Sequence, residues 1–166
     1  MFKVGDKIIH NFYGLCEIAA IEMQDTYYGK QECYIIYMDK TKIMIPVSHS
    51  EMLRYPIGKE EIPGVLDRLS NTNNLPEELP SEERIRLFLE KFKTNDIVKI
   101  SEILRDIVFL GETDKLKTQE KNLRERINKL LSDELSFVQN ITKAEVLKTI
   151  DNCLRKVKES AKCRRK

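Results

Sequence analysis

The side chains with the greatest chemical potential are four cysteines and two histidines. The cysteines stand at positions 16, 33, 153 and 163, a spacing that matches neither a zinc knuckle nor a Cys-x-x-Cys redox pair. His10 and His49 alone cannot supply a histidine-rich metal centre. This pattern favours reduced thiols and ordinary histidines, so we expect no metal site and no catalytic residue.

The glycines and carboxylates also argue against the common enzyme classes. The glycines stand at positions 5, 14, 29, 58, 64 and 111, so no phosphate-binding loop, dinucleotide-binding turn or Gly-x-Ser-x-Gly elbow occurs. Adjacent carboxylates such as Glu60 and Glu61 would point in different directions on a helix and could not share a substrate. The sequence therefore predicts a binding protein with no cofactor and no small-molecule substrate, rather than an enzyme.

Length and hydropathy set the broad class. A chain of 166 residues forms one domain or two small ones. Its wholly apolar runs, such as residues 107–110, are far shorter than the roughly 20 residues needed to cross a bilayer. The first residues carry charges and lack the apolar stretch of a secretion signal. We expect a cytoplasmic protein with no membrane contact.

The charge is unevenly distributed along the chain. Residues 1–57 carry 6 basic and 7 acidic side chains, whereas residues 155–166 carry 7 basic side chains and 1 acidic side chain. Such a cationic segment can contact nucleic-acid phosphates, releasing counterions from them. A soluble, frayed chain end explains the same composition, so the sequence leaves both interpretations open.

Short apolar runs broken by turn residues predict antiparallel strands at the start of the chain. We place them at residues 7–10, 15–23, 32–38 and 42–47. A small sheet with such short turns most economically curls into an SH3-like or Tudor-like partial barrel. Pro46, at the end of the last run, predicts an exposed sheet edge, where a missing amide is tolerated and a strand from another protein can pair.

Beyond residue 57 the pattern predicts helices. Residues 58–80 are rich in Pro, Gly and Asn and indicate a linker with one short helix at 62–69. Apolar residues then recur at steps of three and four, which predicts a helical bundle over 81–158 and a basic tail over 159–166. We expect its four helices at 81–93, 96–110, 118–138 and from 142 onward. The predicted fold is a two-domain α+β chain, in which Arg105 and Asp106 form an internal ion pair.

Several short segments of the sequence resemble those of the CarD/CdnL family of bacterial RNA polymerase-binding transcription regulators. The opening residues 2–10, followed by Tyr13-Gly14, are similar to the start of that family. Residues 43–47 resemble its fourth strand, and residues 102–107, which include Arg105-Asp106, resemble a central helix. The resemblance covers roughly residues 1–155.

The resemblance implies that a Tudor-like domain, shared with transcription-repair coupling factor, docks on the polymerase β subunit by strand pairing. It also implies that the helical domain lies against promoter DNA at the upstream edge of the melted region. The predicted polymerase-binding residues are Lys42, Ile43, Met44, Ile45 and Pro46. The predicted DNA-binding residues are Ser81, Arg84 and Arg86.

Two positions depart from the family's pattern. Family members commonly place a tryptophan where Ser81 stands, and it wedges into the minor groove, whereas this chain has no tryptophan. Many relatives carry an arginine where Met44 stands, so the contact here would be more apolar. An alternative function remains, namely a protein–protein adaptor in which the same two domains contact no DNA.

Overall fold

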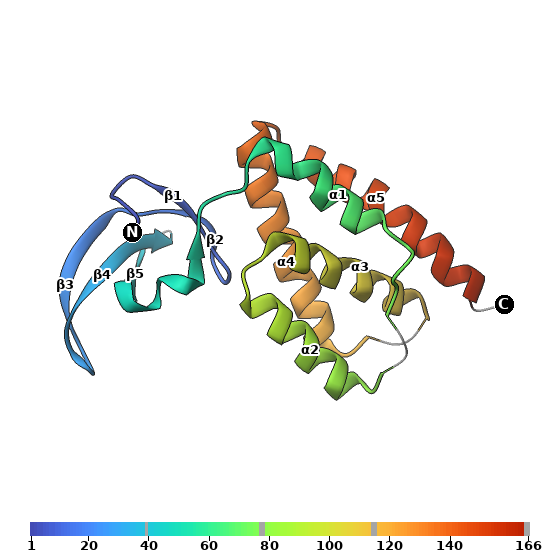
Figure 1. The fold of residues 1–166 in the computed structure, drawn as a ribbon, viewed down its shortest axis with the longest axis horizontal. Coiled ribbons are helices and arrows are strands. Elements are labelled where there is room, and N and C mark those ends of the chain that lie inside the picture. Colours follow the sequence, from blue (N-terminus) through green and yellow to red (C-terminus); the bar gives the residue numbers. More distant parts are fainter. Residues whose placement is uncertain (39, 77–78, 114–115, 165–166) are drawn as a thin grey trace. The chain divides into compact units, whose positions relative to one another are not determined.

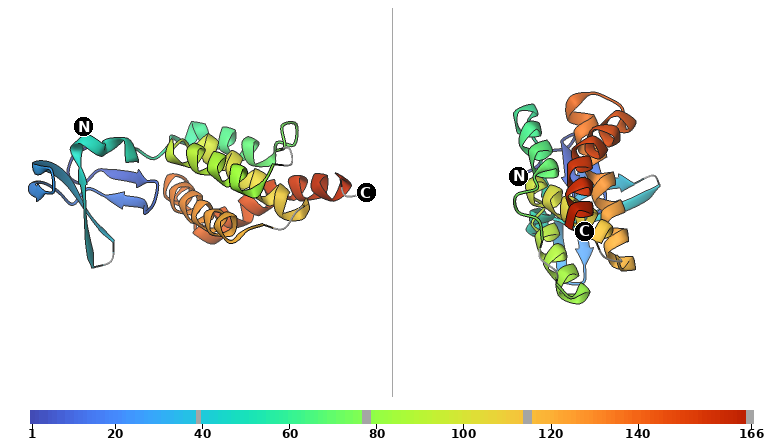
Figure 2. Two further views of the ribbon diagram at one scale, coloured as in Figure 1. Left: turned by 90° about the horizontal axis from the view of Figure 1, so that it is seen from below. Right: turned by 90° about the vertical axis from the view of Figure 1, so that its right-hand side faces the viewer.

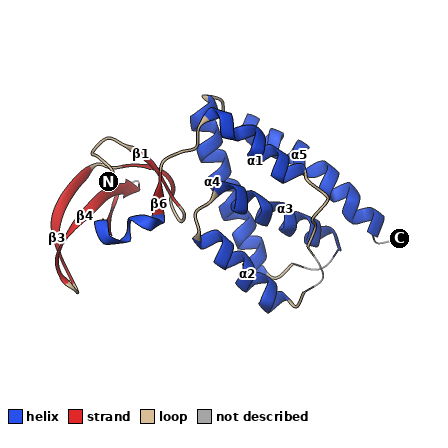
Figure 3. Cartoon of the chain, in the orientation of Figure 1, coloured by secondary structure: helices blue, strands red, loops and turns tan. Residues whose placement is uncertain are grey.

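The structure, a computed structural model, describes residues 1–38, 40–76, 79–113 and 116–164. The chain divides into two compact units, and the boundary between them along the sequence lies between Pro56 and Ile57. Strands occupy the first unit and α-helices the second (Figure 3). This arrangement confirms the predicted two-domain α+β fold class.

The first unit consists of two three-stranded antiparallel sheets (Figure 1). Their strand orders are β2-β1-β6 and β3-β4-β5, and within the described residues the sheets are not joined into a closed barrel. A short 3-10 helix, Val47–Met52, precedes β6. The strands are β1 (Lys7–His10), β2 (Gly14–Glu17), β3 (Ala20–Thr26), β4 (Gly29–Met38), β5 (Thr41–Pro46) and β6 (Leu53–Arg54).

The single strand predicted at residues 15–23 is two strands, β2 and β3. Ile18 directly follows β2, and its amide still donates to the carbonyl of Asp6, in register with the pairing of β1 and β2. The next amide, on Ala19, donates to the carbonyl of Ile35 on β4. The chain therefore changes sheets here while the Ile18 side chain stays fully buried in the core. Hydropathy does not reveal the break, because the apolar pattern continues through it.

Alternate residues of these strands fill one core. In β4, Tyr34 and Ile36 point into it and are fully buried, and Ile45 of β5 joins them with 4% of its surface exposed. Burial of a large apolar side chain of this kind contributes roughly 1.5–3 kcal/mol. The complete cluster comprises Ile8, Cys16, Ile18, Tyr34, Ile36, Ile45 and Leu53. This core fixes which face of β5 points inward.

The second unit is a bundle of five α-helices within the described residues. A single-turn 3-10 helix, Lys59–Glu61, leads into it. Helix α3 is the central element and packs against each of the other four (Figures 1 and 2). The helices are α1 (Ile62–Ser70), α2 (Ser81–Lys93), α3 (Ile97–Thr113), α4 (Thr118–Gln139) and α5 (Lys143–Arg164). None of them has the length and apolarity needed to cross a membrane.

The bundle extends beyond the predicted limits of 81–158 at both ends. Helix α1 packs on α3 and α5, with Val65 and Leu69 fully buried, so the predicted linker contributes a bundle helix. The predicted tail from residue 159 is still helical up to Arg164, and Ala161 within it is fully buried. Residues 165 and 166 lie outside the described residues.

Candidate functional site

Strand β5 is an edge of its sheet. It pairs with β4 on one side, and no strand of the described residues lies on the other side. Ile43 and Ile45 face the core, whereas Met44 between them is 51% exposed. All five predicted polymerase-binding residues, 42–46, lie on this strand. An unpaired edge is a template for a further strand.

The hydrogen-bond pattern shows which β5 backbone groups face the open side. The carbonyl of Ile35 accepts from the Ala19 amide at 2.8 Å, so the Ile35 backbone faces β3. Successive residues of a strand face opposite sides, so Tyr34 faces β5, where it pairs with Ile45. Met44 precedes Ile45 on β5 and therefore directs its N–H and C=O away from β4.

The outward direction repeats every second residue along β5. Lys42, two residues before Met44, presents an N–H and a C=O to the open side. Pro46, two residues after Met44, presents only a carbonyl because proline has no amide hydrogen. The open edge therefore offers two complete pairs of backbone groups, followed by a lone acceptor.

An ion pair crosses the outer face of this sheet. The Lys42 Nζ donates to Glu22 Oε2 on β3 at 3.0 Å, with both side chains substantially exposed. The hydrogen bond from Lys42, reinforced by its charge, lowers the pKa of Glu22, and the same hydrogen bond raises the pKa of Lys42. The Lys42 ammonium group is thus held over the face of the sheet. The side chain exposed beside the open edge is the thioether of Met44.

Arg84, one of the three predicted DNA-binding residues, is buried. Its side chain is only 4% exposed, and its Nε and Nη2 atoms donate to the two carboxylate oxygens of Glu120, at 2.5 and 3.1 Å. A further guanidinium nitrogen donates to the carbonyl of Leu79 at 3.3 Å. This geometry corrects the prediction, because a guanidinium enclosed by protein partners does not present its donors to a phosphate.

The Arg84–Glu120 pair joins two helices. Glu120, which is fully buried, also accepts from the backbone amide of Lys117 at 2.8 Å, as in a capping box at the start of α4. The pair therefore fixes the first turn of α4 against α2. The sequence contains no short motif for it, because the two residues are 36 positions apart.

Ser81 and Arg86 lie at the protein surface. Ser81, the first residue of α2, lines a cavity of about 410 Å³ between α2 and the start of α4. Arg86 is not among its lining residues, and its exposed guanidinium contacts Glu90 one turn later at 3.3 Å. The structure thus brings only Ser81 of the three predicted residues to this cavity.

The cavity at Ser81 continues along the two helices. A neighbouring cavity of about 220 Å³ shares Ile85 and Gln119 with it, so the two form one groove, which we call the α2–α4 groove. Lys117 lines one part of the groove, and Arg126, whose guanidinium lies 5.8 Å from the centre of the Phe92 ring, lines the other. Arg126 belongs to α4 and Lys117 is the residue just before it, and sequence analysis missed both because nothing local pairs this segment with α2.

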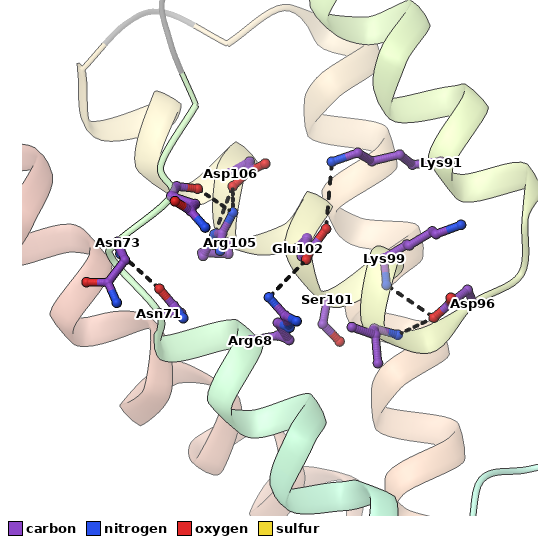
Figure 4. A network of polar contacts seen from close by, with 12 residues as sticks. Arg68, Asn71, Asn73, Lys91, Asp96, Lys99, Ser101, Glu102, Arg105 and Asp106 are labelled. Atoms are coloured by element: carbon purple, nitrogen blue, oxygen red, sulfur yellow. Dashed lines mark hydrogen bonds and ion pairs between the residues drawn. The ribbon is translucent and has the colours of Figure 1, made fainter.

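A second polar cluster surrounds a cavity of about 420 Å³ in the bundle (Figure 4). Arg105 donates to Asp106 through Nε at 2.9 Å and Nη2 at 2.7 Å, which confirms the predicted internal ion pair. Burial raises the pKa of Asp106, and the charge of Arg105 opposes this effect. Arg105 also donates to the carbonyl of Asn74, so the pair anchors the segment between α1 and α2 on α3.

Beside this pair, Glu102 of α3 links two neighbouring helices. It contacts Arg68 of α1 at 3.5 Å and Lys91 of α2 at 3.7 Å (Figure 4). These cations are therefore engaged with a carboxylate of the bundle. Among the described residues, no group of three or more His, Cys, Asp or Glu side chains is placed to hold a metal ion.

Comparison with known proteins relates both units to one family. Residues 2–57 match the family model of the CarD-like/TRCF RID domain, in which RID denotes the RNA polymerase-interacting domain. Residues 64–151, more than half of the chain, match the model of the CarD C-terminal domain.

A curated relative shares both units. It is the "Putative transcription factor YdeB" of Bacillus subtilis (strain 168), which is 26% identical over 149 residues, covering 88% of this chain and 97% of the relative. The chain belongs to the CarD family of transcription regulators, a family of regulators rather than enzymes.

Proposed function

We propose that this CarD-family protein binds the β subunit of RNA polymerase by adding a strand to the open edge of β5. The observation that carries the proposal is the outward direction of the Lys42 and Met44 backbone groups within the domain that matches the polymerase-interacting model. Backbone hydrogen bonds would supply affinity, and the exposed Met44 side chain would add apolar contact. The partner is then an extended segment of the β lobe.

Replacement of Met44 by proline tests this edge in the full-length protein. Met44→Pro removes an outward amide, whereas the bonds to β4 use the neighbouring residues Ile43 and Ile45. Lost hydrogen bonding and steric obstruction should weaken binding to a β-lobe fragment about tenfold or more. Isothermal titration calorimetry of the two purified proteins measures this change.

A proline on the opposite edge of the same sheet is the matched control. Met23 on β3 is 63% exposed, and its backbone faces away from β4, because it lies three residues after Ala20, which pairs with Ile35. Met23→Pro should leave the affinity for the β lobe within about twofold. Docking at β5 would be refuted if both proline substitutions weakened binding to the β lobe equally, or if neither of them weakened it.

We further propose that the helical unit contacts promoter DNA near the upstream edge of the bubble through the α2–α4 groove and Arg86. Ser81 offers a hydroxyl there, and Lys117 and Arg126 offer cationic donors for phosphate oxygens. Weak contact suffices, because attachment to polymerase raises the local concentration of the helical unit at the promoter. Stabilisation of the open complex follows only if the melted promoter is bound better than the closed one.

This DNA contact separates the proposal from the adaptor alternative. The variant Arg86→Gln/Lys117→Gln/Arg126→Gln should bind polymerase normally and lose affinity for a polymerase complex with an upstream-fork promoter fragment. Lys99→Gln, an exposed change on α3, is the control and should leave both affinities unchanged. If filter binding of the promoter complex is the same for the triple variant and the native protein, the protein acts as an adaptor without DNA contact.

A further inference from the structure

The exposed face of α5 carries a row of cations outside the α2–α4 groove. Lys148, Arg155 and Lys162 are all exposed and follow one another at intervals of seven residues. Seven residues make almost two helical turns, so the three side chains lie on one face. At 1.5 Å per residue this α5 row is about 21 Å long. No residue of α5 is among those that line the α2–α4 groove, so the row and the groove are formed by different residues.

Two carboxylates share this face of α5, Asp151 and Glu159. Lys158 donates to Asp151 Oδ1 at 2.7 Å, and this hydrogen bond is the main cause of the lowered pKa of Asp151. The charges of Arg155 and of Arg124 on α4 lower the same pKa further, which places Arg124 within electrostatic reach of this face. Lys158 pairs with Asp151, so on this face the three cations of the α5 row stand against one further carboxylate, Glu159, and positive charge is in excess.

The helix dipole does not account for the position of the row. Cations favoured by the dipole lie in the last turn of a helix, where the effect is concentrated. Lys148 and Arg155 lie more than two turns before the helix ends at Arg164. The predicted frayed tail does not account for it either, because Val157 and Ala161 are fully buried and hold this part of α5 against the bundle.

The row suits a rigid polyanion. Duplex DNA carries one negative charge per about 1.7 Å of its axis, so a 21 Å row passes about twelve phosphates. A membrane surface does not fit, because an interfacial helix must insert an apolar face. Five apolar residues of α5 are buried in the bundle at 0–4% exposure: Val146, Ile150, Leu154, Val157 and Ala161. Leu147, at 43% exposure, is one side chain and does not make an apolar face.

The geometry points to the α5 row as a second DNA-binding surface, which contacts duplex phosphates without reading their sequence. This inference rests on the proposed promoter contact and extends it to a second surface of the bundle. The row would hold duplex DNA by charge, through residues other than those of the α2–α4 groove. Because its contacts are phosphate contacts, they should depend strongly on salt and not on sequence.

The test measures binding of the full-length protein to a fluorescein-labelled random-sequence duplex of about 30 base pairs by anisotropy at several NaCl concentrations. The variant Lys148→Gln/Arg155→Gln/Lys162→Gln should bind more weakly. Each lost phosphate contact reduces the slope of log K against log salt by about 0.9, so we expect a total reduction of about two to three. The matched control Lys30→Gln/Lys59→Gln/Lys99→Gln removes the same charge from exposed positions elsewhere and should leave the slope unchanged.

A charge-retaining variant guards against effects on folding. Lys148→Arg/Arg155→Lys/Lys162→Arg should keep the native slope. Equal slopes for the row variant and the control would overturn the inference. If polyglutamate displaced the duplex as efficiently as unlabelled DNA does, the partner of the row would be an acidic protein. If the protein bound phosphatidylserine vesicles more strongly than the duplex, the partner would be a membrane surface. Either result overturns the inference.

The same duplex separates this inference from the proposed function. The groove variant Arg86→Gln/Lys117→Gln/Arg126→Gln is measured beside the row variant in the same salt series. A loss in the groove variant alone refutes the row and leaves the promoter contact standing. A loss in the row variant alone supports the row, and the groove is then judged by the polymerase–promoter experiment described above.

Discussion

The ion-pair partner of Arg84 gives this side chain a different role from the one that the sequence predicted. In the sequence it stands two residues from Arg86 on a surface helix and resembles a phosphate ligand. In the structure it neutralises Glu120, a fully buried carboxylate that also caps α4. Burial of both charges is tolerable because each satisfies the other. Arg84 therefore serves the bundle rather than a ligand.

Removal of Arg84 should be strongly destabilising. Arg84→Ala leaves the Glu120 carboxylate buried without its cation, and loss of one partner of a buried pair costs about 3–5 kcal/mol. Chemical denaturation of the helical unit measures the free energy of unfolding. Arg86→Ala, at an exposed pair, should change it by less than about 1 kcal/mol. Similar effects at the two positions would contradict the assignment of Arg84.

His10 should make the first unit sensitive to acid. Burial lowers its pKa to about 4 from 6.5, and its Nδ1 accepts hydrogen bonds from the amides of Phe12 and Tyr13. Between these values the unfolded chain binds a proton that the folded chain does not. The free energy of unfolding should therefore fall as the pH is lowered from 6.5 to 4, by on the order of 1–2 kcal/mol after solvent screening.

The variant His10→Asn is the comparison for this pH effect. Its side-chain oxygen can accept from amides two and three residues ahead, as Nδ1 does, and it does not titrate. Urea unfolding between pH 4 and 7 should show a flatter dependence for the variant than for the native protein. Equal slopes for the two proteins would mean that His10 is not the group responsible.

Among the elements, α5 differs most from its sequence-based prediction. Its last two turns are so rich in cations that charge dominates the local sequence, and the pattern suggested a tail from residue 159. Val157 and Ala161, four residues apart, nevertheless keep one narrow apolar face. A helix needs only such a stripe to stay attached to a bundle.

A charge placed on this stripe tests whether the end of α5 is anchored. Ala161 is fully buried, so Ala161→Asp should lower the free energy of unfolding by more than about 2 kcal/mol, because the carboxylate has no partner there. Glu159→Ala, at an exposed neighbour, should have little effect. Thermal unfolding followed by circular dichroism compares them, and an unchanged midpoint for Ala161→Asp would indicate a frayed end.

Most elements were predictable because local periodicity specifies them. The helices expected at 81–93 and 118–138 correspond to α2 and α4, and the edge position of β5 followed from Pro46. The division of residues 15–23 was not predictable, because the apolar pattern continues through Ile18 while the backbone changes partner at the next residue, Ala19. Helix α1 was predicted, but its role in the bundle depends on distant packing against α3 and α5.

The candidate site was less accessible to prediction than the fold. A strand edge can be recognised from a continuous segment, so the five residues predicted to bind polymerase, 42–46, fall together on β5. The α2–α4 groove combines Ser81 with Lys117 and Arg126, which are far away in the chain. No local pattern selects these cations from the 29 basic residues of the sequence.

For the whole molecule, the functions proposed for the two units predict that promoter contact depends on polymerase binding, whereas polymerase binding does not depend on promoter contact. If the first unit attaches the protein to polymerase, the weak DNA contact depends on that attachment through local concentration. Met44→Pro should therefore remove the promoter contact as well, at protein concentrations that saturate the native complex. The groove variant should lose only the promoter contact. Footprinting of the polymerase–promoter complex with each variant measures this difference, and promoter protection by Met44→Pro at the native concentration would contradict it.

Pro46 has a consequence for the lifetime of any complex formed at β5. Its missing amide follows the two outward residues Lys42 and Met44, so an incoming ribbon can form only a short ladder before the donors run out. A short ladder dissociates readily. It also gives two copies of this chain few backbone hydrogen bonds with which to pair. If polymerase binds at this edge as proposed, the strand it contributes would be held by few backbone hydrogen bonds and would be released readily.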